Sequence, residues 1–418
     1  MTPRRLALGP LVLVGVGRRS PFREYAVAAM AERAGLVLMD IHEPAWPKPF
    51  IRSFHLITEP GPEPMLATGR AAISAERAAG IATYDDRYTV PVARLAAEAG
   101  LPGSGLAAAI ACKDKWETRQ RLASRALGAV RASLVTSAAE AVAAARDIGL
   151  PVVLKPRALA ASKGVVRVDD SDDVARGFAI AAAASVPDPV FSAPGVLVEE
   201  CVDGAEFSVD SVICQGQVTP VFVARKLLGP RPFFEEVGHC VTASGLHLLP
   251  AIGPFLQAVH EALGFADGVS HAELRVTPDG YKIMEVNSRL GGGMIPYLGF
   301  LATGIDLAGA VADVALGAEP DLRPRRDPGA EPVRAAAIRF ICPERDLTVA
   351  SIDVPDAVRA DPRVERVVPL VEPGAVLRLP PAGYLGRIAM VITTGDSEQA
   401  CQEAMDDALA KITVTAAA

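Results

Sequence analysis

The sequence lacks the features that mark several large protein classes. Its six cysteines are far apart and include no Cys-x-x-Cys pair, so neither a disulfide framework nor a zinc site is indicated, and a reducing cytoplasm is the expected location. Basic residues are not in excess: the formal net charge is -7, which argues against a nucleic-acid partner. No stretch approaches the roughly 18 consecutive apolar residues of a membrane span, so no membrane partner is expected.

The N-terminus has some likeness to a signal peptide, and its details argue against that interpretation. Arg4 and Arg5 precede an apolar run from Leu6 to Val16. The run contains glycines and a proline, lacks an Ala-x-Ala cleavage site and continues into Arg18-Arg19-Ser20; a secretory signal has the opposite properties. We therefore interpret the run as part of a folded domain.

Lysine is also scarce, and its distribution is uneven. Only eight of the 42 Lys and Arg residues are lysines, and four of them fall in one short stretch: Lys113, Lys115, Lys155 and Lys163. Lysines retained in an arginine-rich chain are candidates for a chemical requirement, and this clustering favours a stretch that binds phosphates.

The N-terminal part of the sequence has a βαβ pattern. A β-rich run from Leu11 to Val16 is followed by a helical pattern through Arg33 and a second apolar run from Leu36 to Ile41, which is typical of an α/β domain. The Gly15-Val16-Gly17 turn suggests a dinucleotide-binding loop, but Ser20 stands where the third glycine of that fingerprint belongs. We interpret it as a tight turn after the first strand.

The chain of 418 residues is long enough for two to four domains. A strand ending near Asp85, a helix over 89–100 and a turn at Leu101-Pro102-Gly103 close the first part. A charged helix is expected over 113–127. After it come an alanine-rich helix over 138–148 and two β-runs that flank a small-residue loop over 158–164; this pattern predicts a hairpin that folds over a ligand.

The second half of the chain is predicted to be mainly β-structure. We expect one antiparallel sheet from five runs: 196–199, 207–213, 218–223, 272–276 and 281–286. The composition of 323–329 is that of a linker. Strands over 334–341 and 388–393 and a helix over 397–412 then suggest a third, smaller α/β domain.

The strongest chemical signal is a pair of β-runs joined by a turn at Thr277-Pro278-Asp279-Gly280. Alternate residues of a strand share one face, so Glu285, Asn287 and Arg289 point the same way. A hairpin at this turn brings Glu273 alongside Glu285. The prediction is one surface with two carboxylates, an amide oxygen and a guanidinium.

Hard oxygen ligands of this kind suit Mg²⁺, which binds a few carboxylates plus substrate phosphates. A carboxylate shared by two ions roughly 3.5–4 Å apart clamps a transferring phosphoryl group, and Arg289 can neutralise charge on that group or on an oxyanion. The alternative is a surface strand pair with a salt bridge. Against it, two carboxylates aimed together repel unless a cation joins them, and Gly291-Gly292-Gly293 follows, where a backbone can approach a ligand closely.

Two further segments are typical of a nucleotide site, although neither defines one alone. Lys155 with the loop Ala160-Ala161-Ser162-Lys163-Gly164 offers a point charge and backbone N–H groups to phosphate oxygens, and the P-loop signature is absent. The apolar strand that ends in Glu199-Glu200 is followed by an Asp-Gly turn and Glu206. This segment can hold an adenine against backbone groups and a ribose against a carboxylate; a strand–turn–strand with solvated acids is the alternative.

In combination, these motifs resemble the ATP-grasp superfamily over residues 80 to 318, and the flanks resemble it loosely. The motifs stand in the order Lys115, Lys155 with its small-residue loop, Glu199-Glu200 to Glu206, Glu273, and Glu285-x-Asn287-x-Arg289. Within the superfamily, Gly238-His239 and the run from Asn287 to Gly292 are most similar to L-amino acid ligases that make dipeptides. Biotin carboxylase-like and purine-biosynthetic ligases are cousins.

The resemblance implies an α/β (α+β) chain with the ATP-grasp fold. We expect a Rossmann-like N-terminal α/β domain over 1–105 and an ATP-grasp domain over 106–322 that contains a lid subdomain over 130–202. A small C-terminal α/β domain is expected over 333–418.

The resemblance also implies a role for each matching position, with ATP and two Mg²⁺ ions as cofactors and Mn²⁺ as an alternative metal. The implied nucleotide contacts are Lys115 and Lys155 to phosphates, a lid of Ser162, Lys163 and Gly164, backbone contacts from Glu199, Glu200, Cys201 and Val202 to adenine, and Glu206 to ribose. The implied metal ligands are Glu273 and Glu285 to both ions and Asn287 to one. Arg289 is the implied catalytic residue, with His239 nearby, and Arg289, Gly292, Gly293 and Met294 are the implied substrate contacts.

Two positions depart from the family pattern, and two histidines stay open. Lys163 replaces the arginine or serine often seen in the lid. Gly293 stands where dipeptide ligases often carry a bulky residue, which implies a roomier substrate pocket. His239 either acts in catalysis or caps a loop, and His271, which precedes the ligand strand, is expected only to pack.

The implied reaction joins a carboxylate and an amine through an acyl phosphate, with release of ADP and phosphate. Amino acids or amino-acid-like acids of bacterial secondary metabolism are the expected substrates, and a homodimer is the expected assembly. Two alternatives stay open at this point. One is an ATP-grasp carboxylase or purine-type ligase that activates bicarbonate or formate, and the other is a non-catalytic nucleotide-binding protein.

Overall fold

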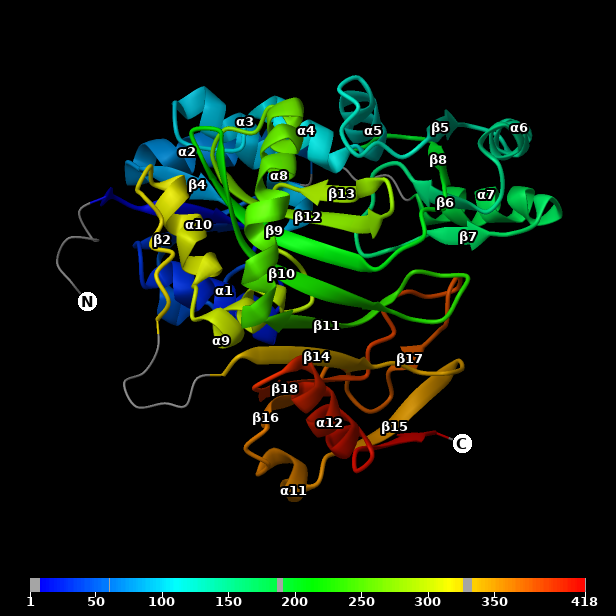
Figure 1. Ribbon diagram of the computed structural model, residues 1–418. Helices are drawn as coiled ribbons and strands as arrows, with labels where there is room; N and C mark the ends of the chain where they lie inside the picture. Colours follow the sequence, from blue (N-terminus) through cyan, green and yellow to red (C-terminus); the bar gives the residue numbers. More distant parts are fainter. Residues whose placement is uncertain (1–7, 60, 186–190, 326–332, 418) are drawn as a thin grey trace.

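A computed structural model describes residues 8–59, 61–185, 191–325 and 333–417. Figure 1 shows a long central sheet with an N-terminal α/β unit at one end, a small sheet at the other, and C-terminal elements along one edge. The expected linker over 323–329 is described only as far as residue 325, and the rest of it lies outside the described residues.

The N-terminal unit is a parallel sheet with the strand order β3-β2-β1-β4. Its elements are β1 (Leu11–Val14), α1 (Pro21–Ala31), β2 (Leu36–Asp40), β3 (Ile51–Leu56), α2 (Pro62–Glu76), β4 (Gly80–Ala82) and α3 (Thr89–Ala99). Every residue of β1 and β2 is buried, because a parallel sheet is covered by helices on both faces. The predicted βαβ unit is confirmed, with β1 parallel to β2.

The glycine turn after β1 is closed by the protein itself. One carboxylate oxygen of Asp40 accepts hydrogen bonds from the backbone N–H groups of Val16, at 2.8 Å, and Gly17, at 3.1 Å. A bound pyrophosphate needs free N–H groups of this kind. The interpretation as a tight turn, rather than as a dinucleotide-binding loop, is therefore confirmed.

The charged helix predicted over 113–127 is confirmed with shorter bounds, and a separate helix that the sequence did not predict precedes it. α4 (Leu106–Lys113) ends before Asp114, and α5 (Lys115–Ala123) begins after it. The carboxylate of Asp114 accepts from the backbone N–H of Trp116 at 3.0 Å and that of Glu117 at 3.3 Å. An aspartate in the N-cap position starts a helix in this way, and here it separates Lys113 from Lys115.

A small antiparallel sheet lies beyond α5, with the order β5-β8-β6-β7. It contains β5 (Ala132–Val135), α6 (Ala138–Ile148), β6 (Val152–Pro156), β7 (Val166–Val168), α7 (Val174–Ala184) and β8 (Val196–Glu200). The predicted hairpin is confirmed, since β6 pairs with β7 around residues 157–165. The strand over 196–199 was expected in the larger sheet and lies here instead, between β5 and β6.

The central sheet has eight strands in the described residues, in the order β13-β12-β9-β10-β11-β14-β18-β16. Its first five strands are β9 (Glu206–Cys214), β10 (Gln217–Leu228), β11 (Glu236–Thr242), β12 (Gly268–Thr277) and β13 (Gly280–Asn287). α8 (Leu249–Leu263) covers one face, and α9 (Ile295–Thr303) and α10 (Leu307–Ala315) lie against the other. Neighbouring strands are antiparallel throughout.

The C-terminal part extends this sheet rather than building one entirely of its own. β14 (Ala335–Ile341), β16 (Val364–Pro369) and β18 (Ala389–Gly395) continue the central sheet from β11. β15 (Leu347–Asp353), β17 (Val376–Leu377) and β19 (Thr413–Ala416) form a separate three-stranded sheet, and α11 (Asp356–Arg359) and α12 (Glu398–Leu409) complete the part. Division of the chain at 105, 322 and 333 stays a prediction.

One face of the central sheet changes character along its length. Val212, Phe222 and Val269 are buried on this face in the core shared with α9 and α10. Toward the small sheet, alternate positions on the same strands are Glu206, Lys226 and Glu273. The same alternation therefore produces a core at one end and a charged surface at the other.

Among the described residues, no single helix is long and apolar enough to cross a membrane. α9 and α10 reach that length and composition only together, across a bend of 107°.

Candidate active site

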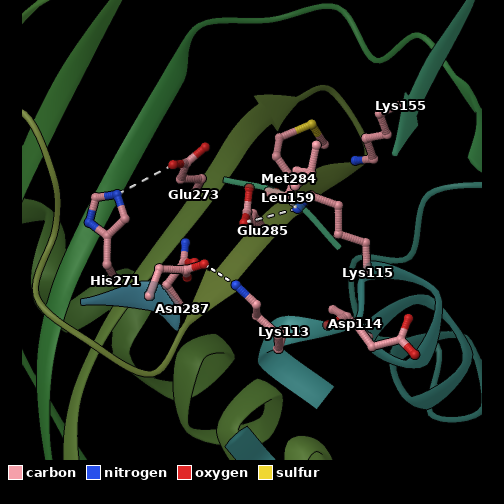
Figure 2. A network of polar contacts seen from close by, with 12 residues as sticks. Lys113, Asp114, Lys115, Lys155, Leu159, His271, Glu273, Met284, Glu285 and Asn287 are labelled. Carbon is pink, nitrogen blue, oxygen red and sulfur yellow. Dashed lines mark hydrogen bonds and ion pairs between the residues drawn. The ribbon is translucent and has the colours of Figure 1, made fainter. Parts of the chain in front are cut away.

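The predicted strand pair forms as expected. β12 and β13 are antiparallel, with Glu273 opposite Glu285 and His271 opposite Asn287. Figure 2 shows the two carboxylates on neighbouring strands, Glu273 on the side of His271 and Glu285 on the side of Lys115. The hairpin that the sequence predicted therefore places these three oxygen-bearing side chains, Glu273, Glu285 and Asn287, on adjacent strands.

Each of the two carboxylates has a lysine partner. Nζ of Lys226 lies 2.7 Å from Glu273, and 2.9 Å from both Glu206 and Glu236. Nζ of Lys115 lies 3.3 Å from Glu285. Burial alone raises the pKa of Glu273, but Lys226 and His271 outweigh it and lower that pKa to about 2.

Lys226 is a candidate functional residue that sequence reasoning missed. It lies near the end of β10, which continues to Leu228, and β11 begins at Glu236. The scarcity of lysine is the signal that could have found it, since Lys226 is one of eight in the chain. Its side chain is 6% exposed and contacts three carboxylates.

Most of the predicted nucleotide residues line one pocket between the small sheet and the central sheet. From the predicted set, its lining contains Lys115, Lys155, Ser162, Glu199, Glu200, Val202, Glu206, Glu273 and Glu285. Residues that the sequence did not predict add to it, namely Val153, Leu159, Val165, Lys226, Phe234, Arg275 and Met284. The apolar members give the pocket surfaces that suit a planar base, and the charged members come from both sheets and from α5.

Buried ion pairs fix the floor of this pocket. Nζ of Lys155 lies 2.7 Å from the carboxylate of Glu199, and Arg119 donates to the same carboxylate at 2.8 and 3.2 Å. Burial raises the pKa of Glu199, but the two cations outweigh it and lower that pKa to about 2. Burial lowers the pKa of Lys155, and Glu199 offsets this only in part.

Arg119 connects the two sheets and was not predicted. Besides Glu199 on β8, its guanidinium donates to the carbonyls of Ile283, at 3.0 Å, and Met284, at 2.7 Å, on β13. These carbonyls directly precede Glu285. The orientation of the nucleotide strand β8 is thus tied to the strand that carries the predicted metal ligands.

The remaining predicted nucleotide residues, several of which also line this pocket, have partners of their own. Glu200 pairs with Arg131 at 2.8 Å, Arg167 contacts the sulfur of Cys201 at 3.2 Å, and Arg275 donates to the carbonyl of Val202 and to Glu206. In the lid loop, Ser162 has φ 54° and Gly164 has φ 72°, and Lys163 is exposed. Lys115 reaches this loop by donating to the carbonyl of Leu159.

Arg289 follows the end of β13 and contacts a residue from the N-terminal unit. Its Nε lies 3.2 Å from Asp86, and its guanidinium donates to the amide oxygen of Asn287 at 3.3 Å. Asp86 also pairs with Lys113. Burial raises the pKa of Asp86, but Arg289 and Lys113 outweigh it and hold that pKa well below its usual range. Asp86 was missed because it is 203 residues from Arg289 in sequence.

The expectation of a roomier pocket at Gly293 is wrong in the direction in which a side chain at this position would project. A Cβ at this position would lie 2.6 Å from Nε2 of His239, and the backbone φ is +57°. The imidazole therefore fills the space that a larger residue would take. Among the described residues neither ring nitrogen of His239 has a hydrogen-bond partner; Nε2 lies 3.5 Å from Glu236. Met294 is 2% exposed and packs in the core.

His271 does more than pack. Its Nδ1 lies 3.2 Å from the carboxylate of Asp210, and its Nε2 lies 3.4 Å from Glu273. Burial alone lowers the pKa of His271, but these two carboxylates outweigh it and raise that pKa to about 10. The expectation that this residue only packs is therefore wrong.

The donor set fits Mg²⁺ bound together with phosphates. Among the described residues, no three His, Cys, Asp or Glu side chains converge on a point where they could bind a metal ion. The predicted set offers two carboxylates and an amide oxygen, which is fewer protein ligands than a dedicated cage has and in line with Mg²⁺ sites that substrate phosphates complete.

Comparisons with known proteins agree with this fold. Residues 148–296 match the model of the ATP-grasp domain, and residues 339–417 match the L-amino acid ligase C-terminal domain 2. A Sinorhizobium fredii protein, uncharacterized protein y4rH, is 30% identical over 342 residues, which cover 80% of this chain and 67% of that protein. Alanine--anticapsin ligase from Bacillus subtilis is 27% identical over 311 residues, or 66% of this chain and 65% of the ligase.

The solved structure of an L-amino acid ligase from Bacillus licheniformis has the same fold, with a TM-score of 0.78 and 22% identity over 98% of this chain and 99% of that one. The chain belongs to the ATP-grasp superfamily of ligases. The matched regions span about two thirds of the two relatives found by sequence. The fold class that the sequence predicted is confirmed.

Proposed function

We propose that the protein is an ATP-dependent carboxylate–amine ligase that forms an amide or peptide bond through an acyl phosphate, with release of ADP and phosphate. We further propose amino acids or amino-acid-like acids as substrates, in bacterial secondary metabolism. The observation that carries this proposal is the pairing of Glu273 with Glu285 on β12 and β13, where both carboxylates line the pocket and Asn287 follows two residues after Glu285. The similarity to two Bacillus proteins, alanine--anticapsin ligase and an L-amino acid ligase, supports the substrate class.

In the proposed reaction, the carboxylate of one substrate attacks the γ-phosphorus of ATP, and the bond to the ADP oxygen breaks. Lys115 and Lys155 neutralise phosphate charge from the two sides of the pocket. When Mg²⁺ is bound by Glu273, Glu285 and Asn287, it supplies electrostatic stabilisation to the transferring phosphoryl group.

The second step forms the C–N bond. The amine attacks the carbonyl carbon of the acyl phosphate, phosphate leaves with the bonding electron pair, and the amine loses its proton. Arg289 stabilises the oxyanion of the tetrahedral intermediate; its place between Asn287 and Asp86 holds the guanidinium beside the metal ligands. The loop over 158–164 covers the pocket and keeps water from the acyl phosphate.

The test is ADP and phosphate release with a matrix of amino-acid pairs in the wild type and in Glu285→Ala. We expect at least one pair to give an amide product, and we expect Glu285→Ala to lose about 100-fold or more in turnover, because a missing electrostatic stabiliser typically costs that much. The control is Glu98→Ala, which removes a surface carboxylate paired with Arg70 and Arg94.

Unchanged turnover in a folded Glu285→Ala variant contradicts the metal assignment. Turnover with bicarbonate and with no amino-acid pair contradicts the ligase proposal and favours a carboxylase. ATP binding measured by calorimetry, with no ADP formed from any substrate, contradicts catalysis altogether.

We also propose that the protein is a homodimer in the cytoplasm. Related ligases are commonly dimeric, and the six cysteines are all free, as expected of a reducing compartment. Sedimentation equilibrium at several protein concentrations tests the dimer, and a monomer at every concentration contradicts it.

A further inference from the structure

Two buried polar residues beside the proposed metal site have no part in the reaction described above. Asp210 on β9 and His271 on β12 lie directly opposite each other. Asp210 is 0% exposed and His271 is 4% exposed. Burying a carboxylate and an imidazole is costly unless each has partners, so their contacts indicate what the pair does.

The first contact leads to a proposed metal ligand. The ring of His271 lies between two carboxylates, with Nδ1 3.2 Å from Asp210 and Nε2 3.4 Å from one oxygen of Glu273. The other oxygen of Glu273 lies 2.7 Å from Lys226. Figure 2 shows the ring edge-on to Glu273, on the side away from Glu285.

The second contact leads to the glycine loop before α9. The backbone N–H of Gly291 donates to Asp210 at 3.2 Å. A Cβ at position 291 would lie 2.7 Å from Nδ1 of His271 and 3.0 Å from Asp210. Glycine is needed here because the loop backbone lies directly against the Asp210–His271 pair. This loop continues into Gly292 and Gly293, the proposed substrate contacts.

We infer that Asp210 and His271 are positioning residues that hold Glu273 in its metal-binding orientation and fix the 291–293 loop at a set distance from it. This inference rests on the proposed ligase function. A chain of polar contacts from a buried carboxylate through an imidazole to a ligand carboxylate limits the rotamers of the ligand. The pair thereby connects two parts of the proposed active site. One is the place of phosphoryl transfer, and the other is the loop that contacts the second substrate.

The two proposed carboxylate ligands differ in this respect. Glu285 contacts Lys115, which comes from α5, whereas Glu273 contacts His271, which is paired with Asp210 within the sheet itself. A purely structural role for the pair predicts loss of stability alone. A positioning role predicts loss of metal affinity in a protein that stays folded.

The experiment compares Mn²⁺ binding to the full chain in the presence of ADP, followed by electron paramagnetic resonance, with thermal unfolding of the same samples. We expect His271→Gln to weaken Mn²⁺ binding by about 10- to 100-fold, the usual effect of removing a residue that orients a metal ligand. The matched control is His260→Gln. His260 is equally buried and bonds Ser270, the neighbour of His271, at 2.6 Å, so this variant should keep wild-type Mn²⁺ affinity.

A second variant leaves the histidine and the aspartate intact. Gly291→Ala forces a methyl group against the ring and should also weaken Mn²⁺ binding, whereas an added Cβ at Gly253 on α8 would lie 3.8 Å from the nearest atom, in Pro220, so Gly253→Ala should not. Wild-type Mn²⁺ affinity in both His271→Gln and Gly291→Ala overturns the inference, as does equal weakening in His260→Gln.

The ligase proposal fails separately, by the absence of ADP release from the wild type with any substrate pair. Where the wild type turns over, His271→Gln should lower kcat and raise the Mg²⁺ concentration needed for half-maximal rate. Loss of kcat with an unchanged Mg²⁺ requirement overturns the inference and leaves the ligase proposal standing.

Discussion

The two ends of one face of the central sheet are built by the same strands and have opposite chemistry. Where α9 and α10 cover the face, Val212, Phe222 and Val269 form a core. Where the small sheet approaches it, Lys226 and Glu273 stand at equivalent alternate positions. The difference teaches that strand periodicity decides which residues share a face, and that the covering element decides whether the face becomes a core or a site.

The two ends should therefore respond differently to loss of one side chain. Phe222→Ala removes a fully buried ring and should lower the free energy of unfolding by about 3–5 kcal/mol. Lys226→Met leaves Glu206, Glu236 and Glu273 without their shared cation and should cost a similar amount, about 3–5 kcal/mol, because a buried charge loses its partner. Urea unfolding measures both.

Added Mg²⁺ separates the two variants. A divalent cation can replace the lost ammonium among carboxylates, so Mg²⁺ should restore part of the stability of Lys226→Met by binding the folded state. It should restore none in Phe222→Ala. Lys282→Met, which removes a bond to the carbonyl of Ala129, is the control for loss of a lysine. Equal responses to Mg²⁺ in the first two variants contradict the comparison.

The small sheet that faces the charged end should also be sensitive to acid, through Glu199 on β8. The pKa of Glu199 is lowered to about 2 in the folded protein, so its contribution to stability is present above the pKa of an unfolded glutamate, about 4.3, and is lost as the pH falls toward 2. Glu199→Gln should be less stable than the wild type at pH 7, and the difference should shrink between pH 4.5 and 2. Unfolding curves at pH 7, 4 and 3 measure this, and a constant difference argues against the ion pairs with Arg119 and Lys155.

The smallest effect is expected at the boundary between the two ends, where Gly293 meets His239. Gly293→Ala should cost about 1–2 kcal/mol, because alanine is strained at positive φ and its methyl group meets the imidazole. In the His239→Ala background the same change should cost less, since only the backbone strain is left. Thermal unfolding of the four proteins of this cycle measures the coupling, and additive costs contradict the contact.

Local patterns were enough to predict the β12–β13 hairpin and its carboxylates. The residues involved are close in sequence, and a Pro-Asp-Gly turn sets their register. The start of the charged helix was placed at Lys113, two residues too early, although Asp114 followed three residues later by Glu117 is a known N-terminal signal. That error came from taking the bounds of the helix from the run of charged residues.

Other parts of the site depend on contacts that no local pattern contains. Asp86 meets Arg289 across 203 residues, and Arg119 meets Met284 across 165. The run over 196–199 was correctly predicted as a strand and placed in the wrong sheet, because periodicity identifies a strand without naming its neighbour. The individual site roles of these residues stay proposals until variants are measured.

The pairing of β11 with β14 has a practical consequence for anyone who wishes to shorten or recombine this protein. β11 carries Glu236 and His239, and its outer edge is paired with β14 from Gly238 to Thr242. Cutting the chain before residue 333 would remove β14 and leave the backbone N–H and C=O groups of that edge of β11 unpaired. An exposed strand edge of this kind can pair with other chains and cause aggregation. A chimera that exchanges C-terminal segments between ligases must therefore supply a strand that pairs with β11, because the boundary of the exchanged segment lies between two neighbouring strands of one sheet.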